Sequence, residues 1–243
     1  MTAVAGGAIL PHAPLLVPGV AGDALEPELH PIRSAARAID FDGVDAIVVL
    51  SPHGEASGVY AQSKADLCAF GVPDSAIEWR TDDDLVRRLA AAWEVDVLDG
   101  PVDHGVAVPV ALSRPAVPVI GACLPEGTGV SESAMRFAQA LGHSSGEATL
   151  AFVASVNTSA GLTPRAPFTE LPGARAIEAR LRTALEDDSG RVDGVVTELE
   201  AVGRSCGAGP LAVFGALFSG RAATVAAHEW PVGVGYMVAT VGT

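Results

Sequence analysis

Short, almost wholly apolar runs recur along this chain of 243 residues, and they constrain its fold more than any other feature. The runs cover residues 3–10, 44–50, 117–124 and 149–156. A strand that is apolar at every position is buried on both faces, which is typical of a parallel sheet covered by helices. The sequence therefore predicts a single α/β domain with a central, mostly parallel or mixed sheet.

Segments with helical patterns separate these runs, as expected for strand-helix-strand units. Residues 22–39 favour a helix in their second half, because Pro27 and Pro31 indicate a loop or a helix start before it. The segment that begins at Thr81 has an acidic first turn and an apolar stripe, which predicts a capped helix. Further elements are expected as helices over 131–142, over 174–202 with a break near Ser189, and over 209–219, and as a strand over 230–241.

The charge balance argues against nucleic-acid and membrane partners. The chain has 15 Lys and Arg against 29 Asp and Glu, which gives a formal net charge of −14 at pH 7. Such a surface repels phosphate backbones and anionic bilayers. No apolar run reaches the ~20 residues that a bilayer requires, and Met1 is not followed by a basic leader. We therefore expect a cytoplasmic protein that acts on a small molecule, and we leave a homo-oligomer open.

The three cysteines, Cys68, Cys123 and Cys206, are widely spaced and include no CxxC pair. An odd number at this spacing indicates neither a disulfide framework nor a zinc knuckle. We expect all three side chains to be reduced and buried.

Histidines beside proline or glycine are the strongest candidates for a functional site. His12 follows the first apolar run and His53 follows the second, both in Pro-His sequences. Because ligands gather outside the carboxyl ends of strands in open α/β sheets, the two imidazoles can converge. His104 lies in an Asp-His-Gly sequence, and Glu229 lies near the start of the last predicted strand. Two imidazoles and a carboxylate form the facial arrangement of non-haem Fe(II) oxygenases, while the same ligands also hold Zn²⁺.

Structural roles compete with these assignments and stay open at this point. His12 and His53 can cap turns near a sheet edge, and His104 can bond to a neighbouring strand. Because side chains alternate along a strand, His228 and Glu229 should not both enter one pocket. Glu229 is the preferred third ligand, with His228 as the alternative.

Five segments follow one another along nearly the whole chain: GAILPHAPLLVPG, VVLSPHGEA, DHGVAVPVAL, FVASVNTSAGL and HEWPVGVGYMVA. In this order they resemble the motifs of the class III extradiol ring-cleavage dioxygenase superfamily, which includes the catalytic subunit of protocatechuate 4,5-dioxygenase and the Memo proteins. The resemblance implies that residues 1–243 form one catalytic-subunit-like domain with a central sheet. It also implies that His12, His53 and Glu229 hold Fe(II), and that His104 contacts substrate.

The segment after the fourth predicted strand departs from the superfamily pattern. Ring-cleaving members carry a histidine there that acts as an acid and base toward the substrate, whereas this chain has Ala160. An alanine cannot transfer a proton, and loss of a positioned acid or base typically lowers the rate by ~10² to 10⁴. Asn157 stands where a carboxylate is usual, and we expect Asn157 and Thr158 to contact substrate. His104 is then the remaining candidate catalytic residue.

Three functions fit these residues. The first is an Fe(II)-dependent, extradiol dioxygenase-like protein that acts on a catechol or a related aromatic molecule. The second is a non-catalytic, Memo-like module that binds a metal or ligand and has another protein as its partner. The third is a hydrolase in which Zn²⁺ activates water.

Overall fold

The computed structural model describes residues 4–21, 23–127, 130–164 and 169–242. Within these residues one eight-stranded sheet forms the centre, in the order β6-β3-β7-β2-β8-β1-β10-β9. Its strands are β1 (Val4–Leu10), β2 (Ala46–Ser51), β3 (Gly58–Tyr60), β6 (Asp96–Leu98), β7 (Val119–Cys123), β8 (Leu150–Ser155), β9 (Thr224–Glu229) and β10 (Tyr236–Val241). The predicted fold class is confirmed, because the central pairs β7-β2, β2-β8 and β8-β1 are all parallel.

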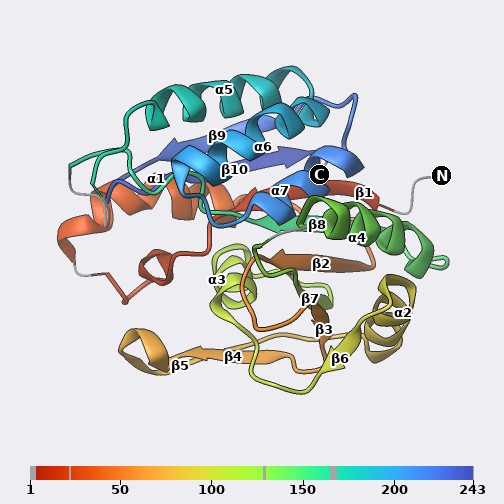
Figure 1. The fold of residues 1–243 in the computed structure, drawn as a ribbon. Helices are drawn as coiled ribbons and strands as arrows, with labels where there is room; N and C mark the ends of the chain where they lie inside the picture. The colour runs from red at the N-terminus through yellow and green to blue at the C-terminus, as the bar shows by residue number, and fades with distance from the viewer. Residues whose placement is uncertain (1–3, 22, 128–129, 165–168, 243) are drawn as a thin grey trace.

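Antiparallel pairs occur toward both edges of this sheet, which makes it mixed. At one edge β1 pairs with β10 and β10 pairs with β9. Toward the other edge β3 pairs with β7 antiparallel, and β6 then pairs with β3 in parallel. A separate hairpin consists of β4 (Lys64–Leu67) and β5 (Val72–Glu78). Figure 1 shows the large sheet from β9 near the top to β6 lower down, with the hairpin at the bottom.

Helices cover both faces of the sheet. They are α1 (Glu26–Arg37), α2 (Asp83–Trp93), α3 (His104–Ser113), α4 (Val130–Ser144), α5 (Ala174–Asp187), α6 (Asp193–Glu198) and α7 (Ala208–Leu217). Short turns of helix are η1 (Pro14–Leu16), η2 (Asp23–Leu25), η3 (Cys68–Phe70), η4 (Ser189–Val192) and the π-helical η5 (Leu199–Gly203). Among the described residues, no helix is long and apolar enough to cross a bilayer.

The apolar runs are buried on both faces, as the sequence predicts. All six residues of β2 are buried. Ile47 and Val49 pack with α1, α3 and the hairpin, while Val48 and Leu50 pack with α2, α4 and α7. This alternation follows from the two-residue period of a strand, and it divides the core into two layers.

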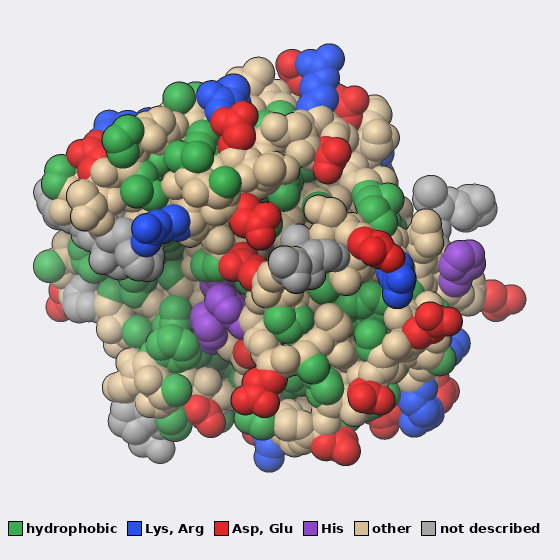
Figure 2. All heavy atoms as spheres, in the orientation of Figure 1, with side chains coloured by type: hydrophobic (Ala, Val, Ile, Leu, Met, Phe, Trp, Pro, Cys, Tyr) green, Lys and Arg blue, Asp and Glu red, His purple; other side chains and the backbone are tan. Residues whose placement is uncertain are grey.

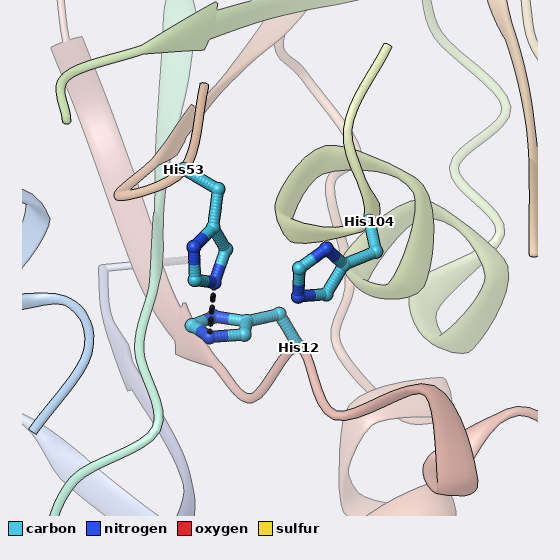
Figure 3. A group of neighbouring side chains, drawn as sticks. All are labelled: His12, His53 and His104. Carbon is cyan, nitrogen blue, oxygen red and sulfur yellow. Dashed lines mark hydrogen bonds between the residues drawn. The ribbon is translucent and has the colours of Figure 1, made fainter. Parts of the chain in front are cut away.

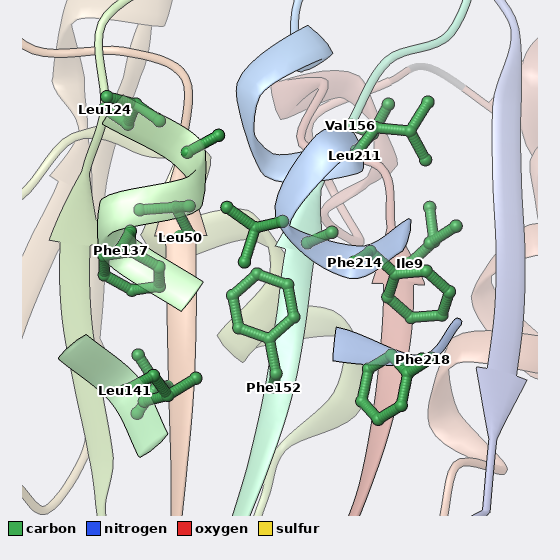
Figure 4. Close-up of a cluster of buried hydrophobic side chains, with 14 of the residues drawn as sticks. Ile9, Leu50, Leu124, Phe137, Leu141, Phe152, Val156, Leu211, Phe214 and Phe218 are labelled. Atoms are coloured by element: carbon green, nitrogen blue, oxygen red, sulfur yellow. The ribbon is translucent and has the colours of Figure 1, made fainter. Parts of the chain in front are cut away.

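The larger of these two core layers, which contains Val48 and Leu50, is built around Phe152 on β8. The ring centroid of Phe152 lies 6.1 Å from that of Phe137 on α4. Figure 4 shows side chains of α4 and α7, among them Phe137 and Phe214, beside Leu50, Phe152 and Ile9 of the strands. All of these side chains are fully buried.

Replacing Phe152 with alanine is expected to lower the free energy of unfolding by about 3–5 kcal/mol, because a fully buried aromatic ring leaves a cavity that its neighbours fill only in part. Met135 on α4 is 47% exposed, so Met135→Ala is the matched control and should change stability by less than about 0.5 kcal/mol. Urea denaturation followed by circular dichroism measures both. A Phe152→Ala loss no larger than that of the control would contradict this account of the core.

Several element boundaries differ from the prediction. α1 begins at Glu26, so Pro27 lies in its first turn and Pro31 lies inside it. A proline in the first turn costs little because its missing N–H would have no helical partner, and burial of Leu29 and Ile32 holds the helix. The cap of α2 is Asp82 rather than Thr81, and it accepts two backbone N–H bonds.

Other elements end elsewhere or are absent from the prediction. α4 extends past Gly142 to Ser144, whereas the expected break near Ser189 is present between α5 and η4. α3, the four strands β3 to β6, and β9 have no counterpart in the prediction. All three cysteines lie in the described part of the chain and none forms a disulfide; Cys123 is buried and Cys206 is partly buried, but Cys68 is exposed, contrary to the prediction.

Candidate metal centre

Three histidines meet at the edge of the sheet where the parallel strands end. His12 follows β1, His53 follows β2, and His104 is the first residue of α3. Each offers one ring nitrogen, and these three atoms lie within 4.8 Å of one another. In Figure 3 the imidazoles of His53 and His104 both approach that of His12. Imidazole nitrogens at this separation form a donor set for a transition metal.

The ring of His12 meets the other two rings edge to face. His53 and His104 are nearly parallel, with centroids 4.3 Å apart, whereas His12 stands almost perpendicular to both. The Nε2 atoms of His12 and His53 lie 3.1 Å apart. Two nitrogens bound to one tetrahedral Zn²⁺ lie about 3.4 Å apart, so a small movement brings these two atoms to ligand spacing.

Hydrogen bonds from the strand ends fix the ring of His12. The residue is fully buried. Its backbone N–H donates to Oδ1 of Asn157 at 3.1 Å, and its Nδ1 lies 2.9 Å from the hydroxyl of Ser155. Because Nδ1 is engaged in this way, Nε2 is the atom that faces the other histidines. Such outer contacts commonly orient a metal ligand.

One carboxylate positions the backbone that carries the other two histidines. Asp103 caps α3, whose first residue is His104. Its Oδ1 accepts a bond from the hydroxyl of Ser51 at 2.7 Å, and that same hydroxyl accepts the backbone N–H of His53 at 3.0 Å. Its Oδ2 accepts the hydroxyl of Tyr60 at 2.7 Å. Burial and the negative charge of Asp103 raise the pKa of Tyr60, so the phenol remains a donor.

Burial lowers the pKa of all three imidazoles. For His12 burial is the main cause, and the neighbouring His53 and His104 add to it. The pKa of His53 is also lowered by burial, and that of His104 falls to about 4 through burial and the proximity of His53. At neutral pH the rings are therefore uncharged, which is the form that binds metal.

The metal-free protein is expected to lose stability as the pH falls from about 7 to about 5. An unfolded chain protonates its histidines near the ordinary pKa of 6.5, whereas folded His104 resists until about 4. The unfolded state thus binds more protons in this window, which lies above the range of most carboxylates. The melting temperature measured against pH tests this. His104→Gln removes one histidine with a lowered pKa, so the melting temperature of this variant should fall less between pH 7 and pH 5 than that of the wild type. An equal dependence of melting temperature on pH in the two proteins would contradict the prediction.

Cys206 is the residue of this site that the sequence prediction missed. Its Sγ lies 3.2 Å from Nε2 of His12, and a backbone bridge to Asn157 holds it there. Burial, reinforced by the charge of Glu126, raises the pKa of the thiol to about 11. The spacing of the cysteines indicates only the absence of a disulfide framework and of a CxxC site, and it does not point to Cys206. The glycine that follows Cys206, Gly207, matches the small flanking residues of the histidine sites and was the available signal.

The strand β9 places Glu229 outside this group. The side chain of Glu229 is exposed, while that of the preceding His228 turns inward, as strand alternation requires. Nε2 of His228 lies 2.6 Å from the buried carboxylate of Glu178, which also accepts the hydroxyls of Thr158 and Ser159. Neither residue joins His12 and His53 in this structure, and the ligand role of Glu229 stays a prediction without support here.

The expected substrate contacts lie along one stretch after β8. Asn157 is buried and adjoins the histidines through its bond to His12. Thr158 is buried, but its hydroxyl donates to Glu178 at 2.7 Å and is not in the histidine group. Ala160 is partly buried, and its backbone N–H donates to the carbonyl of Gly203 at 2.7 Å. No titratable side chain stands at position 160.

A cavity of about 610 Å³ lies beside His104. The β4-β5 hairpin, η3 and the loop before α3 form its walls. The ring of Phe70 meets that of His104 at a centroid distance of 4.8 Å. Figure 2 shows histidine atoms at the surface near the centre of this face, with hydrophobic side chains and carboxylates around them. A cavity of this size accommodates a small molecule.

Comparison with known proteins places the fold but not the activity. No protein-family model matches the chain, and no curated protein sequence matches it. Among solved structures, it is similar to the uncharacterized protein JW3007 from Escherichia coli K12, with a TM-score of 0.64 and 16% sequence identity. The match covers 98% of this chain and 99% of that chain. At this identity the likeness shows a shared fold alone.

Proposed function

We propose that this protein is an extradiol dioxygenase-like metalloprotein, in which His12 and His53 hold a divalent metal and a small aromatic molecule binds beside His104. The observation that carries the proposal is the convergence of three ring nitrogens within 4.8 Å. Their position at the carboxyl ends of the strands supports it, because α/β folds bind ligands there. The resemblance of five sequence segments to the superfamily supports it independently.

The donor set fits a borderline transition metal. Neutral imidazoles suit iron and zinc, and the thiol of Cys206 beside His12 is a softer donor that also suits zinc. We propose Fe(II) as the metal, with Zn²⁺ as the alternative. When bound, iron would supply redox chemistry with O₂, and either metal would act as a Lewis acid.

The protein's own residues would position the ligand. Phe70 and His104 present an edge-to-face pair of rings at the cavity, which suits a flat aromatic molecule. The imidazole of His104 can accept a proton from a ligand hydroxyl at a ring nitrogen. Asp103 caps α3 through the backbone N–H of Gly105, so the backbone that carries His104 is fixed before the ligand arrives.

A second candidate is a non-catalytic module that binds metal and has a protein partner. Two observations favour it: Ala160 offers no acid or base, and Cys206 adds a thiol beside His12. An oxygenase consumes O₂ with a catechol, whereas a binding module turns over nothing. A zinc hydrolase would cleave an ester without O₂.

Anaerobic purification, metal analysis and an oxygen-uptake screen over catechols test the proposed function. We expect the purified protein to contain iron and to bind a catechol. We also expect it to take up oxygen measurably only when the catechol is present. Metal binding without any uptake would favour the module. Absence of metal binding under all conditions would overturn both candidates.

Replacing Cys206 with serine is expected to weaken Co²⁺ and Zn²⁺ binding by about 10- to 100-fold, because the thiol either coordinates the metal or orients His12. Cobalt distinguishes these roles. A thiolate-to-cobalt charge-transfer band in the wild type that disappears in Cys206→Ser shows coordination, and its absence in both shows orientation. Cys68→Ser on exposed η3 is the matched control, and it should leave affinity unchanged. An unchanged affinity in Cys206→Ser would remove Cys206 from the site.

A further inference from the structure

A second cavity, of about 540 Å³, lies between α1 and the far end of α3. α3 begins at His104 and extends for ten residues, so this cavity is about 15 Å from the histidines along the helix. Its wall contains three arginines and only one carboxylate, Glu26. This excess of two positive charges occurs in a chain whose formal net charge is −14.

Arg33 forms the fixed part of the wall. Its guanidinium pairs with the carboxylate of Glu26, so its charge is balanced. It also donates to the backbone carbonyls of Leu16 at 2.7 Å and Leu15 at 3.1 Å. These bonds attach η1 to α1 and give the cavity a rigid side.

Arg37 and Arg114 supply the unbalanced charge. Within the described residues, no carboxylate lies within 4.0 Å of either guanidinium, and neither guanidinium forms a hydrogen bond. Both also line a smaller adjoining hollow of about 270 Å³, which includes Asp40 and Asp42. Most other described arginines pair with a carboxylate, among them Arg33, Arg87, Arg136, Arg175, Arg180, Arg182 and Arg191.

The helix ends explain part of this arrangement. Arg37 lies in the last turn of α1, and Arg114 follows the last turn of α3, where positive charge interacts well with the helix dipole. The dipole alone does not account for two guanidinium groups at one cavity. Arg114 also has a φ of 48°, a conformation that a glycine adopts with less strain. The chain therefore has an arginine where a glycine would be easier to accommodate.

We propose that Arg37 and Arg114 bind the phosphate group of a small phosphorylated molecule in this cavity. A phosphate monoester carries close to two negative charges and matches two unpaired guanidinium groups, whereas a single guanidinium suffices for a carboxylate. His30 and Ser34, 3.2 Å apart at the rim, add polar groups. The remaining wall is apolar and suits the carbon part of the ligand.

Calorimetric titration of the full-length, metal-free protein with phenyl phosphate tests the proposal. Removal of metal with a chelator prevents phosphate from binding to a metal at the histidines. The variant His53→Ala should bind phenyl phosphate as the wild type does. We expect Arg37→Gln and Arg114→Gly each to weaken binding by about tenfold or more, since each removes a charge-assisted contact. Arg114→Gly also relieves backbone strain, so loss of binding cannot be attributed to unfolding. Arg87→Gln on α2 is the matched control and should bind normally.

Three results would overturn the proposal. One is the absence of phenyl phosphate binding by the wild type at millimolar concentration. Another is unchanged affinity in both arginine variants. The third is binding of benzoate as tight as that of phenyl phosphate, which would show that the site binds any aromatic anion and does not select a phosphate. Weakening of phenyl phosphate binding by added sodium chloride would support the proposal, because exposed charge pairs are screened by salt.

Discussion

Replacement of His53 with alanine is expected to abolish tight metal binding while the fold remains intact. Nε2 of His53 lies 3.1 Å from that of His12, so it is the closest imidazole donor to the buried one. Residues that only orient a ligand cost up to about 100-fold in affinity when removed, and a lost ligand should cost more. His53 is only partly buried, so its removal should leave no large cavity.

Competition titration with a chromophoric chelator measures this loss, and far-ultraviolet circular dichroism reports the fold. His143→Ala is the matched control, because His143 is an exposed histidine at the end of α4 and should not alter affinity. Two outcomes would contradict the assignment. If His53→Ala binds metal like the wild type, the histidines do not form the site. If it fails to fold, the ring has a structural role.

The fold class could be predicted from the sequence because its clearest local pattern, the fully apolar run, corresponds directly to the buried strands at the centre of the sheet. β2 and β8 are apolar at nearly every position, and both are buried on both faces. α3 was missed for a related reason. Its residues Gly105–Val110 are buried all round, so the segment has no 3.6-residue period to identify a helix. The strands β3, β4 and β6 have only three or four residues, too few for any period to appear. β5 has seven residues, but its sequence VPDSAIE is not an apolar run.

The candidate site was predicted only where local sequence and strand ends coincide. His12 and His53 follow strands whose ends meet at one edge, so their convergence could be expected. The position of Cys206 depends on a backbone bridge to Asn157, 49 residues earlier, which no local pattern encodes. Strand alternation predicted that only one of Glu229 and its neighbour His228 would point inward. It could not predict that the inward one, His228, would pair with Glu178.

Wild-type protein loaded with Fe(II) is expected to bind a catechol and to consume oxygen slowly, and Ala160→His should accelerate this by about 10²-fold or more. The expectation rests on the proposed function. A positioned acid or base contributes about 10² to 10⁴ in rate, and position 160 provides none. Ala160 is partly buried on the stretch that also carries Asn157, whose side chain bonds to His12. The prediction requires that a histidine at this position reach the ligand beside the metal, which the variant tests.

Steady-state oxygen uptake compares the wild type with Ala160→His, and Ala160→Gln is the matched control because it adds similar bulk without an acid or base. His104→Ala tests the remaining imidazole at the cavity and should reduce uptake in every background. Fast wild-type turnover that disappears in His104→Ala would show that His104 already transfers the proton, and position 160 would then be irrelevant. Equal rates in Ala160→His and Ala160→Gln would mean that the new imidazole does not reach the ligand. Failure of every variant to bind a catechol, with metal bound, would favour the non-catalytic module, because the metal site would then be present without the substrate that ring cleavage requires.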